Sequence, residues 1–273
     1  MKTRVITATV MVALMIPFLW FSHTIAFPIL LAFLAALGVY EMQSCLGLKK
    51  QKASLAPAVL YALFLPFLMR YWQEKWKILF ILTFALITYL FILSVFHRSY
   101  GVEEAGLTGM TTLYIGFGFA SLAMLRSLAF GQWIYILAFI IPWLTDTFAY
   151  FCGRAFGKRK LIPEVSPKKT VEGAVGGTVC AVLLTLLYGF LVGTFAFVTP
   201  NYLGLAIISA AVSVLAQCGD LVMSRIKRKY GIKDYGKLFP GHGGVLDRFD
   251  SILTAAPFLY FLSSLFPSLH LFR

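Results

Sequence analysis

An uncharged run of 25 residues decides the fold class of this chain. Residues 173–197 read GAVGGTVCAVLLTLLYGFLVGTFAF and contain no Asp, Glu, Lys or Arg. A helix needs about 20 mostly apolar residues to cross the hydrocarbon core of a bilayer. The run therefore predicts a transmembrane helix, and the same length test can be applied outward along the chain.

The whole chain has the composition of a membrane protein. It is 60% hydrophobic and 13% charged over 273 residues, with a mean hydropathy of +0.83. A soluble domain carries about 25% charged residues. We predict an all-α, polytopic integral membrane protein with about nine transmembrane helices at residues 5–22, 24–42, 54–71, 78–96, 105–125, 131–152, 173–197, 202–223 and 247–267.

Basic residues predict how the chain crosses the membrane. With the N-terminus in the cytoplasm, 19 of the 24 Lys and Arg residues fall on the cytoplasmic side, as the positive-inside rule requires. Both polar loops, 153–172 and 224–248, then face the cytoplasm. The first apolar segment can also be taken as a signal peptide, but because many spans follow we expect an uncleaved helix. We predict a protein of the cytoplasmic (inner) membrane whose active site faces the cytoplasm.

Acidic residues divide the chain. Seven of the eleven fall in 146–250, so we predict a transmembrane scaffold in 1–125 and a catalytic transmembrane region in 126–273. The net charge of +13 is attributed to the positive-inside bias and to anionic headgroups, and no nucleic-acid partner is expected. The four cysteines are scattered singly, which argues against disulfides or a zinc site.

One group of polar residues stands near the end of the eighth predicted span. Asp220, Ser224 and Lys227 are spaced by four and three residues, so they share one face of a helix. A carboxylate below the headgroups costs up to about 3 kcal/mol unless it is paired or metal-bound. The alternative is an Asp–Lys pair that lets the helix end reach the interface.

A second group opens the ninth predicted span. Asp247 and Asp250 are three residues apart and therefore neighbours on a helix. Acidic residues also favour a helix N-terminus through the macrodipole, which is the simpler interpretation. Together with Asp220 they can hold Mg²⁺, a hard cation that binds carboxylate and phosphate oxygens.

Two loop segments suggest anion binding. The turn PGHGG at 240–244 has three glycines that allow backbone N–H groups to approach an anion, although Pro-Gly marks turns in general. His242 within it is either a phosphate contact or a surface histidine. The stretch SPKKT at 166–170 resembles an anion-binding entry to a helix N-terminus. The spacings Gly153/Gly157 and Gly173/Gly177 indicate close helix packing.

No Walker A, Gly-x-Ser-x-Gly or His-Glu-x-x-His motif occurs in the sequence. The carboxylates, cations and glycine turn therefore favour phosphoryl transfer that depends on positioning of the substrates and on a metal ion, without a covalent enzyme intermediate.

Residues 219–250 resemble the signature of the phosphatidate cytidylyltransferases, also called CDP-diacylglycerol synthases. The resemblance rests on Lys233-Asp234, the whole 240–244 turn, and Asp247-Arg248 with Asp250. Ser224 departs from the pattern, because two residues instead of three separate it from Lys227-Arg228. The segment 146–173 is similar to the second motif region of the family.

The resemblance implies transfer of CMP from CTP to phosphatidate, giving CDP-diacylglycerol and pyrophosphate, by direct in-line attack of the lipid phosphate. It implies Mg²⁺ as cofactor, with a second cation left open. The implied metal ligands are Asp220, Asp247, Asp250 and Asp146. The implied catalytic residues are Asp220, Asp247, Lys227 and His242. The implied substrate-binding residues are Ser166, Lys168, Lys169, Thr170, Ser224, Arg228, Lys233 and Arg248.

Two other functions fit the same residues. A related CTP-dependent enzyme can act on an isoprenoid or ether lipid, because residues that contact lipid tails are simply apolar. An anionic-solute transporter can use intramembrane charges, but its polar residues are expected near the midplane of several spans. The small-residue helix faces permit a homodimer. Because phosphatidate lies in the leaflet, we expect a polar cavity open to both cytoplasm and bilayer.

Overall fold

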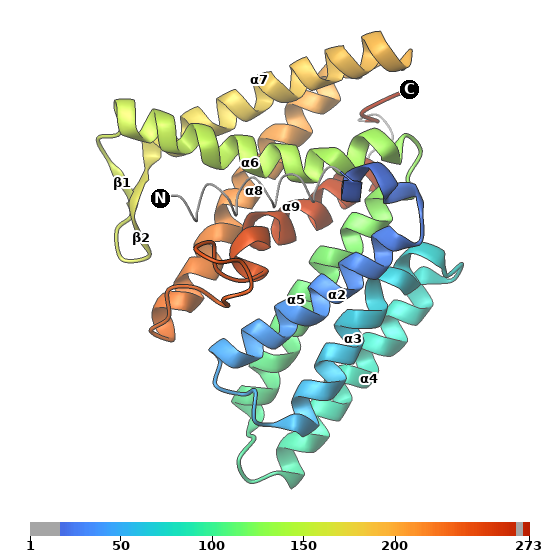
Figure 1. Cartoon of the computed structure of the whole chain (residues 1–273), viewed down its shortest axis with the longest axis vertical. Coiled ribbons are helices and arrows are strands. Elements are labelled where there is room, and N and C mark those ends of the chain that lie inside the picture. The colour runs from blue at the N-terminus through green and yellow to red at the C-terminus, as the bar shows by residue number, and fades with distance from the viewer. Residues whose placement is uncertain (1–16, 266–269) are drawn as a thin grey trace. The chain divides into compact units, whose positions relative to one another are not determined.

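The computed structural model describes residues 17–265 and 270–273, and these residues are almost entirely helical. A short two-stranded sheet is inserted between two of the helices (Figure 1). In chain order the elements are η1 (Phe21–His23), α2 (Ala26–Cys45), α3 (Lys52–Tyr71), α4 (Lys75–Phe96), α5 (Val102–Arg126), α6 (Gly131–Phe156), β1 (Lys160–Ile162), β2 (Ser166–Thr170), α7 (Val171–Ala196), α8 (Tyr202–Lys229) and α9 (Leu246–Leu265).

Seven of these helices, α2 to α8, are long and apolar enough to cross a membrane. They confirm the predicted all-α membrane fold and seven of the predicted spans. Helix α9 matches the predicted span 247–267 as far as Leu265, but it is not among the seven. Its first five residues include Asp247, Arg248 and Asp250, which lower its hydropathy. Most of the predicted span 5–22 lies outside the described residues.

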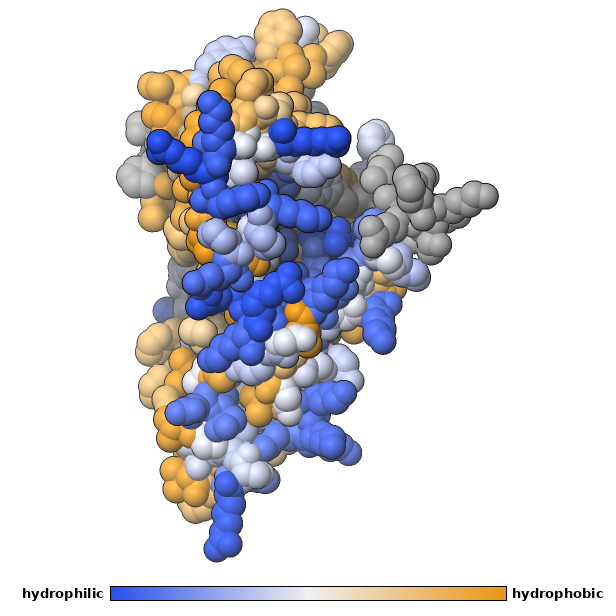
Figure 2. Space-filling model, turned by 90° about the vertical axis from the view of Figure 1, so that its left-hand side faces the viewer, coloured by the Kyte–Doolittle hydropathy of each residue, from blue (hydrophilic) through white to orange (hydrophobic). Residues whose placement is uncertain are grey.

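The exposed surface of α7 shows why such helices need lipid. Val175, Val179, Leu183 and Leu187 are spaced by four residues and are all exposed, at 49–60%. They form one apolar stripe along a helix. In water this stripe would be a large hydrophobic patch, whereas lipid solvates it without cost. On the face drawn in Figure 2, hydrophilic and apolar side chains likewise occupy separate areas.

The described residues fall into two compact units. The first takes in the chain up to Met124 together with Tyr230–Phe249, and the second takes in Leu125–Lys229 and Asp250–Arg273. The loop after α8 and the first turn of α9 thus belong with α2 to α5. The first unit has its core around α2 and α3, which pack along each other (Figure 1). Leu31, Ala35 and Val39 of α2 are fully buried there.

Helices α6 and α7 form the tightest contact of the second unit. A Cβ added to Gly173 would lie 2.6 Å from the Ala149 carbonyl oxygen, and one added to Gly177 would lie 2.6 Å from that of Thr145. Only glycine permits backbones to approach this closely. The close packing expected from the Gly173/Gly177 spacing is confirmed, and it brings the ends of α6 and α7 together around the intervening loop.

The loop between α6 and α7 is a β-hairpin, which the sequence analysis did not foresee. Strands β1 and β2 pair antiparallel, with Lys160 opposite Thr170. The Glu172 carboxylate accepts the backbone N–H groups of Lys158 and Arg159 at 3.0–3.2 Å and closes the base of the hairpin. The Thr170 hydroxyl accepts the Gly173 N–H at 3.1 Å and caps α7.

A chain of polar side chains joins α6, α7 and α8. The hydroxyls of Thr145 and Ser213 are 2.8 Å apart, and the Ser213 hydroxyl donates to the Thr178 hydroxyl oxygen at 3.0 Å. The Gln217 amide also donates to the Thr178 oxygen at 3.0 Å. Polar groups inside a membrane need such partners, so this chain fixes how the three helices align.

Candidate active site

Three carboxylates from three helices form the polar centre of the second unit. Asp146 comes from α6, Asp220 from α8 and Asp250 from α9, and each side chain is partly buried. Coulombic interactions connect Asp220 with Asp146, and they connect Asp250 with both of the other two. We call Asp146, Asp220 and Asp250 the acidic cluster.

Asp220 is bound by two side chains. The Lys169 ammonium of β2 forms an ion pair with the Asp220 Oδ2 atom, with side chains that are 26% and 19% exposed. The Ser224 hydroxyl donates to Asp220 Oδ1 at 3.2 Å. The predicted shared face of Asp220 and Ser224 is confirmed. The partner of the carboxylate is Lys169, which the sequence analysis assigned to substrate binding.

Asp146 and Asp250 meet at one serine. The Ser251 hydroxyl lies 3.2 Å from Asp146 Oδ2 and 3.5 Å from Asp250 Oδ1, and the Ser251 N–H donates to Asp250 Oδ1 at 2.8 Å. Lys227 of α8 interacts electrostatically with Asp250. The cluster therefore combines three acidic groups with two cations, Lys169 and Lys227.

Oxygen donors dominate this site. The donors are carboxylates and serine hydroxyls, which are the hard ligands that Mg²⁺ prefers. Within residues 17–265 and 270–273, no three His, Cys, Asp or Glu side chains are arranged to hold a metal ion. The chemistry of the donors thus fits Mg²⁺, while the cation that contacts Asp220 in this structure is Lys169.

In the first unit, the loop before α9 is held by two buried carboxylates. Asp247 Oδ2 accepts the backbone N–H groups of Tyr235 and Gly244 at 2.7 and 2.9 Å. Glu41 of α2 accepts those of Val245 and Leu246, both at 2.9 Å. The amides that end the glycine turn therefore do bind anions, but the anions are the protein's own side chains.

The other predicted residues have varied positions. Thr170 is the N-cap of α7, as described above. The Nδ1 atom of His242 is buried and has no hydrogen-bond partner among the described residues. Ser166 is partly buried in β2. Four of the predicted substrate-binding cations are exposed, namely Lys168, Arg228, Lys233 and Arg248.

The structure brings together only some of the predicted site. Asp220, Lys169 and Ser224 make direct contacts, and Asp146 joins Asp250 through Ser251. Lys233, His242, Asp247 and Arg248 belong to the first unit, and the remaining predicted residues belong to the second. Convergence of Asp220 with Asp247 therefore stays a prediction.

Two contributors were missed by the sequence analysis. Ser251 follows Asp250 directly and carries no signal of its own in the sequence. Glu41 falls near the end of the predicted span 24–42. This position was the only hint in the sequence, because an acidic residue inside a span has to find a partner.

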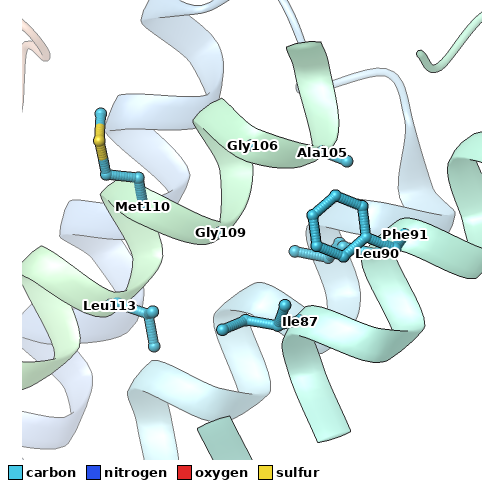
Figure 3. Close-up of a pocket in the computed structure, with 8 residues that line it drawn as sticks. All are labelled: Ile87, Leu90, Phe91, Ala105, Gly106, Gly109, Met110 and Leu113. Carbon is cyan, nitrogen blue, oxygen red and sulfur yellow. The ribbon is translucent and has the colours of Figure 1, made fainter. Parts of the chain in front are cut away.

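Two hollows in the described part of the structure are apolar. One of about 320 Å³ lies between α4 and α5 and is lined by Leu90, Met110 and neighbouring residues, none of them charged (Figure 3). The other, of about 360 Å³, lies in the second unit among β1, α7 and α8. Neither offers charged groups for a nucleotide, but Gln217 and Leu221 of the second hollow lie within a turn of Asp220.

Comparison with known proteins decides the family. The model of the cytidylyltransferase family matches residues 2–266. The chain belongs to the cytidylyltransferase family. It is 36% identical over 276 residues to the phosphatidate cytidylyltransferase of Bacillus subtilis (strain 168), covering 97% of this chain and 98% of that protein. Proteins of the same name from Staphylococcus haemolyticus (strain JCSC1435) and Staphylococcus saprophyticus are 34% and 36% identical, each covering 96% of this chain and 98% of the relative.

Proposed function

We propose that this cytidylyltransferase transfers CMP from CTP to phosphatidate, giving CDP-diacylglycerol and pyrophosphate. The observation that carries the proposal is the contact between Lys169 and Asp220. It joins the two segments that resemble the family motifs, 146–173 and 219–250, in one polar cluster of a membrane protein. The names of the relatives, which match over nearly the whole chain, supply the substrates.

The chemistry asks the protein to bring two polyanions together. An oxygen of the lipid phosphate forms a bond to the α-phosphorus of CTP, while the bond from that phosphorus to the bridging oxygen breaks and pyrophosphate leaves. Lys169 and Lys227, the two cations of the cluster, would offset the charge of the phosphates. Such positioning and charge stabilisation supply most of the rate in phosphoryl transfer.

We assign the acidic cluster to a metal ion. Asp220, Asp146 and Asp250 are not arranged around an ion in the described structure, so their side chains would turn to hold Mg²⁺. Asp247 is the further ligand that the sequence predicts. When bound, Mg²⁺ neutralises phosphate oxygens and orients the leaving group. Lys169 would then move from Asp220 to a phosphate, since an ammonium that pairs with a carboxylate can pair equally with a phosphate oxygen.

The lipid is proposed to reach this site from the side. Phosphatidate lies in the leaflet, and the apolar hollow among β1, α7 and α8 lies next to Asp220 along α8. Its lining includes Val175 and Val179 of the lipid-facing stripe of α7, so it suits an acyl chain. The basic hairpin and the loop after α8 are proposed to face the cytoplasm, where CTP is present.

The test is a product assay with purified protein. Radiolabelled CTP and phosphatidate are expected to give CDP-diacylglycerol in the presence of Mg²⁺ and none after chelation. Asp220→Asn and Asp247→Asn are both expected to lower the rate, and near-normal rates in both would refute the metal assignment. Ether-lipid and isoprenoid phosphates serve as competing acceptors. Solute uptake by proteoliposomes without CTP turnover would favour a transporter instead.

A further inference from the structure

Glu41 is a buried carboxylate with an unusual set of partners. Its side chain belongs to α2, and the residue is only 8% exposed. Both of its oxygens accept backbone N–H groups, Oε1 from Val245 and Oε2 from Leu246. Its partners lie more than 200 residues away in the sequence, directly before Asp247.

The loop is shaped to receive this carboxylate. A Cβ added to Gly236 or to Gly244 would collide with the Glu41 carboxyl oxygens. Gly38, one turn before Glu41 on α2, faces Leu246, whose Cδ2 atom would be 3.1 Å from an added Cβ. The loop thus packs against α2 at Gly38 and at Glu41, and the absence of side chains at Gly236 and Gly244 leaves the space that the carboxylate needs.

The contact reaches Asp247 through three consecutive amides. The Gly244 N–H donates to Asp247 Oδ2, and the next two N–H groups donate to Glu41. Because these amides belong to one short backbone segment, fixing two of them also fixes the third. Hydrogen bonds to a charged acceptor are shorter and stronger than neutral ones, so the segment is held firmly.

We propose that Glu41 is a positioning residue for the reaction. It fixes the backbone of residues 244–246 and thereby orients the Asp247 carboxylate, which the proposed function uses as a metal ligand. This inference rests on the proposed function. Groups that orient a ligand typically change metal affinity or activity by about 10- to 100-fold when they are removed.

The experiment compares Glu41→Gln with Gln43→Met. Glutamine keeps the shape of Glu41 but replaces one acceptor oxygen with an amide that faces a backbone N–H. Gln43 is a matched control, because it is also buried on α2 but accepts a hydrogen bond from Thr108 of α5 instead of from the loop. Gly244→Ala tests the same contact from the loop side.

Two measurements separate positioning from general stability. Hydrogen–deuterium exchange of a peptide covering residues 235–246 is expected to speed up in Glu41→Gln and to stay at the wild-type level in Gln43→Met. The half-saturating Mg²⁺ concentration for CDP-diacylglycerol formation is expected to rise about tenfold in Glu41→Gln and in Gly244→Ala. A loss of folded protein alone would lower the maximal rate without moving this concentration.

The outcomes are distinguishable. An unchanged exchange rate of residues 235–246 in Glu41→Gln would show that Glu41 does not hold the loop. Faster exchange with an unchanged Mg²⁺ dependence would overturn the positioning role and leave Glu41 a purely structural residue. If the wild-type protein makes no CDP-diacylglycerol, the proposed function fails, whereas the exchange comparison still decides whether Glu41 holds the loop.

Discussion

The buried and partly buried carboxylates of the candidate site are bound differently in the two units. In the second unit, the Lys169 ammonium and the Ser224 hydroxyl bind Asp220, and the Ser251 hydroxyl binds Asp146. Asp250 accepts both the backbone N–H and the hydroxyl of Ser251. In the first unit, Glu41 and Asp247 are bound by four backbone amides. Both groups are acidic and at least partly buried, so burial alone does not separate them.

The difference is whether the hydrogen-bond partners of a carboxylate can be exchanged for a ligand. An ammonium or a hydroxyl sits on a flexible side chain and can turn away when a metal ion or a phosphate arrives. A backbone amide cannot leave without deforming the loop that carries it. The acidic cluster of the second unit is therefore suited to exchanging its partners for a ligand. In the first unit, the amides fix the loop and with it the orientation of Asp247, the further metal ligand of the proposed function.

The sharpest way to break this comparison is to neutralise one carboxylate of each kind. Asp220→Asn is expected to lower CDP-diacylglycerol formation by about 100-fold or more, because it removes charge from the reaction centre, with little loss of thermal stability. Asp247→Asn is expected to lower the melting temperature as well, because hydrogen bonds to a charged group contribute about 1.5–3 kcal/mol each. Equal melting temperatures in the two variants would contradict the distinction.

A second test removes the exchangeable partner. Lys169→Met is expected to raise KM for CTP about tenfold, since a charged hydrogen bond to phosphate is lost and each 1.4 kcal/mol corresponds to a factor of ten. Lys160→Met, which removes a cation from the other strand of the same hairpin, is the control and should leave KM near the wild-type value. Similar KM values in both variants would show that Lys169 acts only as part of the net charge.

A third test concerns the helix contact beneath the acidic cluster. Gly173→Ala is expected to lower the free energy of unfolding by about 1–3 kcal/mol, because the added methyl group collides with the Ala149 carbonyl oxygen. Gly106→Ala on α5 is the control, since an added Cβ meets nothing within 4 Å there. Thermal unfolding in detergent measures both. Equal stability of the two variants would mean that α6 and α7 can move apart at little cost.

The smallest effect is expected at the cap of α7. Thr170→Val removes the hydroxyl that accepts the Gly173 N–H, which should cost about 1 kcal/mol of stability. Thr170→Ser keeps the hydroxyl and should retain most of that stability. A rise in KM for CTP in the valine variant, beyond the loss of stability, would support the substrate-binding role that the sequence predicts. An unchanged free energy of unfolding would contradict the cap.

The membrane fold could be predicted from the sequence because lipid imposes a simple length and polarity requirement on each helix. The glycine spacing at 173/177 likewise has one dominant physical meaning, and the structure confirms it. The hairpin at 160–170 could not be foreseen, because its strands are only three and five residues long and carry no clear alternation of polar and apolar residues.

The site was predictable in part for a related reason. Asp220 and Ser224 lie on one helix, where spacing alone determines that they meet. The partners Lys169 and Glu41 come from distant segments, and no local pattern tells which cation or which loop a buried carboxylate will choose. For Thr170 the resemblance implied a substrate-binding role, whereas in the structure its hydroxyl caps α7.

The polar chain of Thr145, Thr178, Ser213 and Gln217 has a consequence for how the protein is made. Helices α6 and α7 leave the ribosome before α8, so they can insert as a close pair joined by their glycines. The Thr178 hydroxyl oxygen then gains its two donors on α8, Ser213 and Gln217, only when α8 has inserted. We therefore expect insertion of α8 to complete the hydrogen bonding of Thr178 and to bring Asp220 to Lys169.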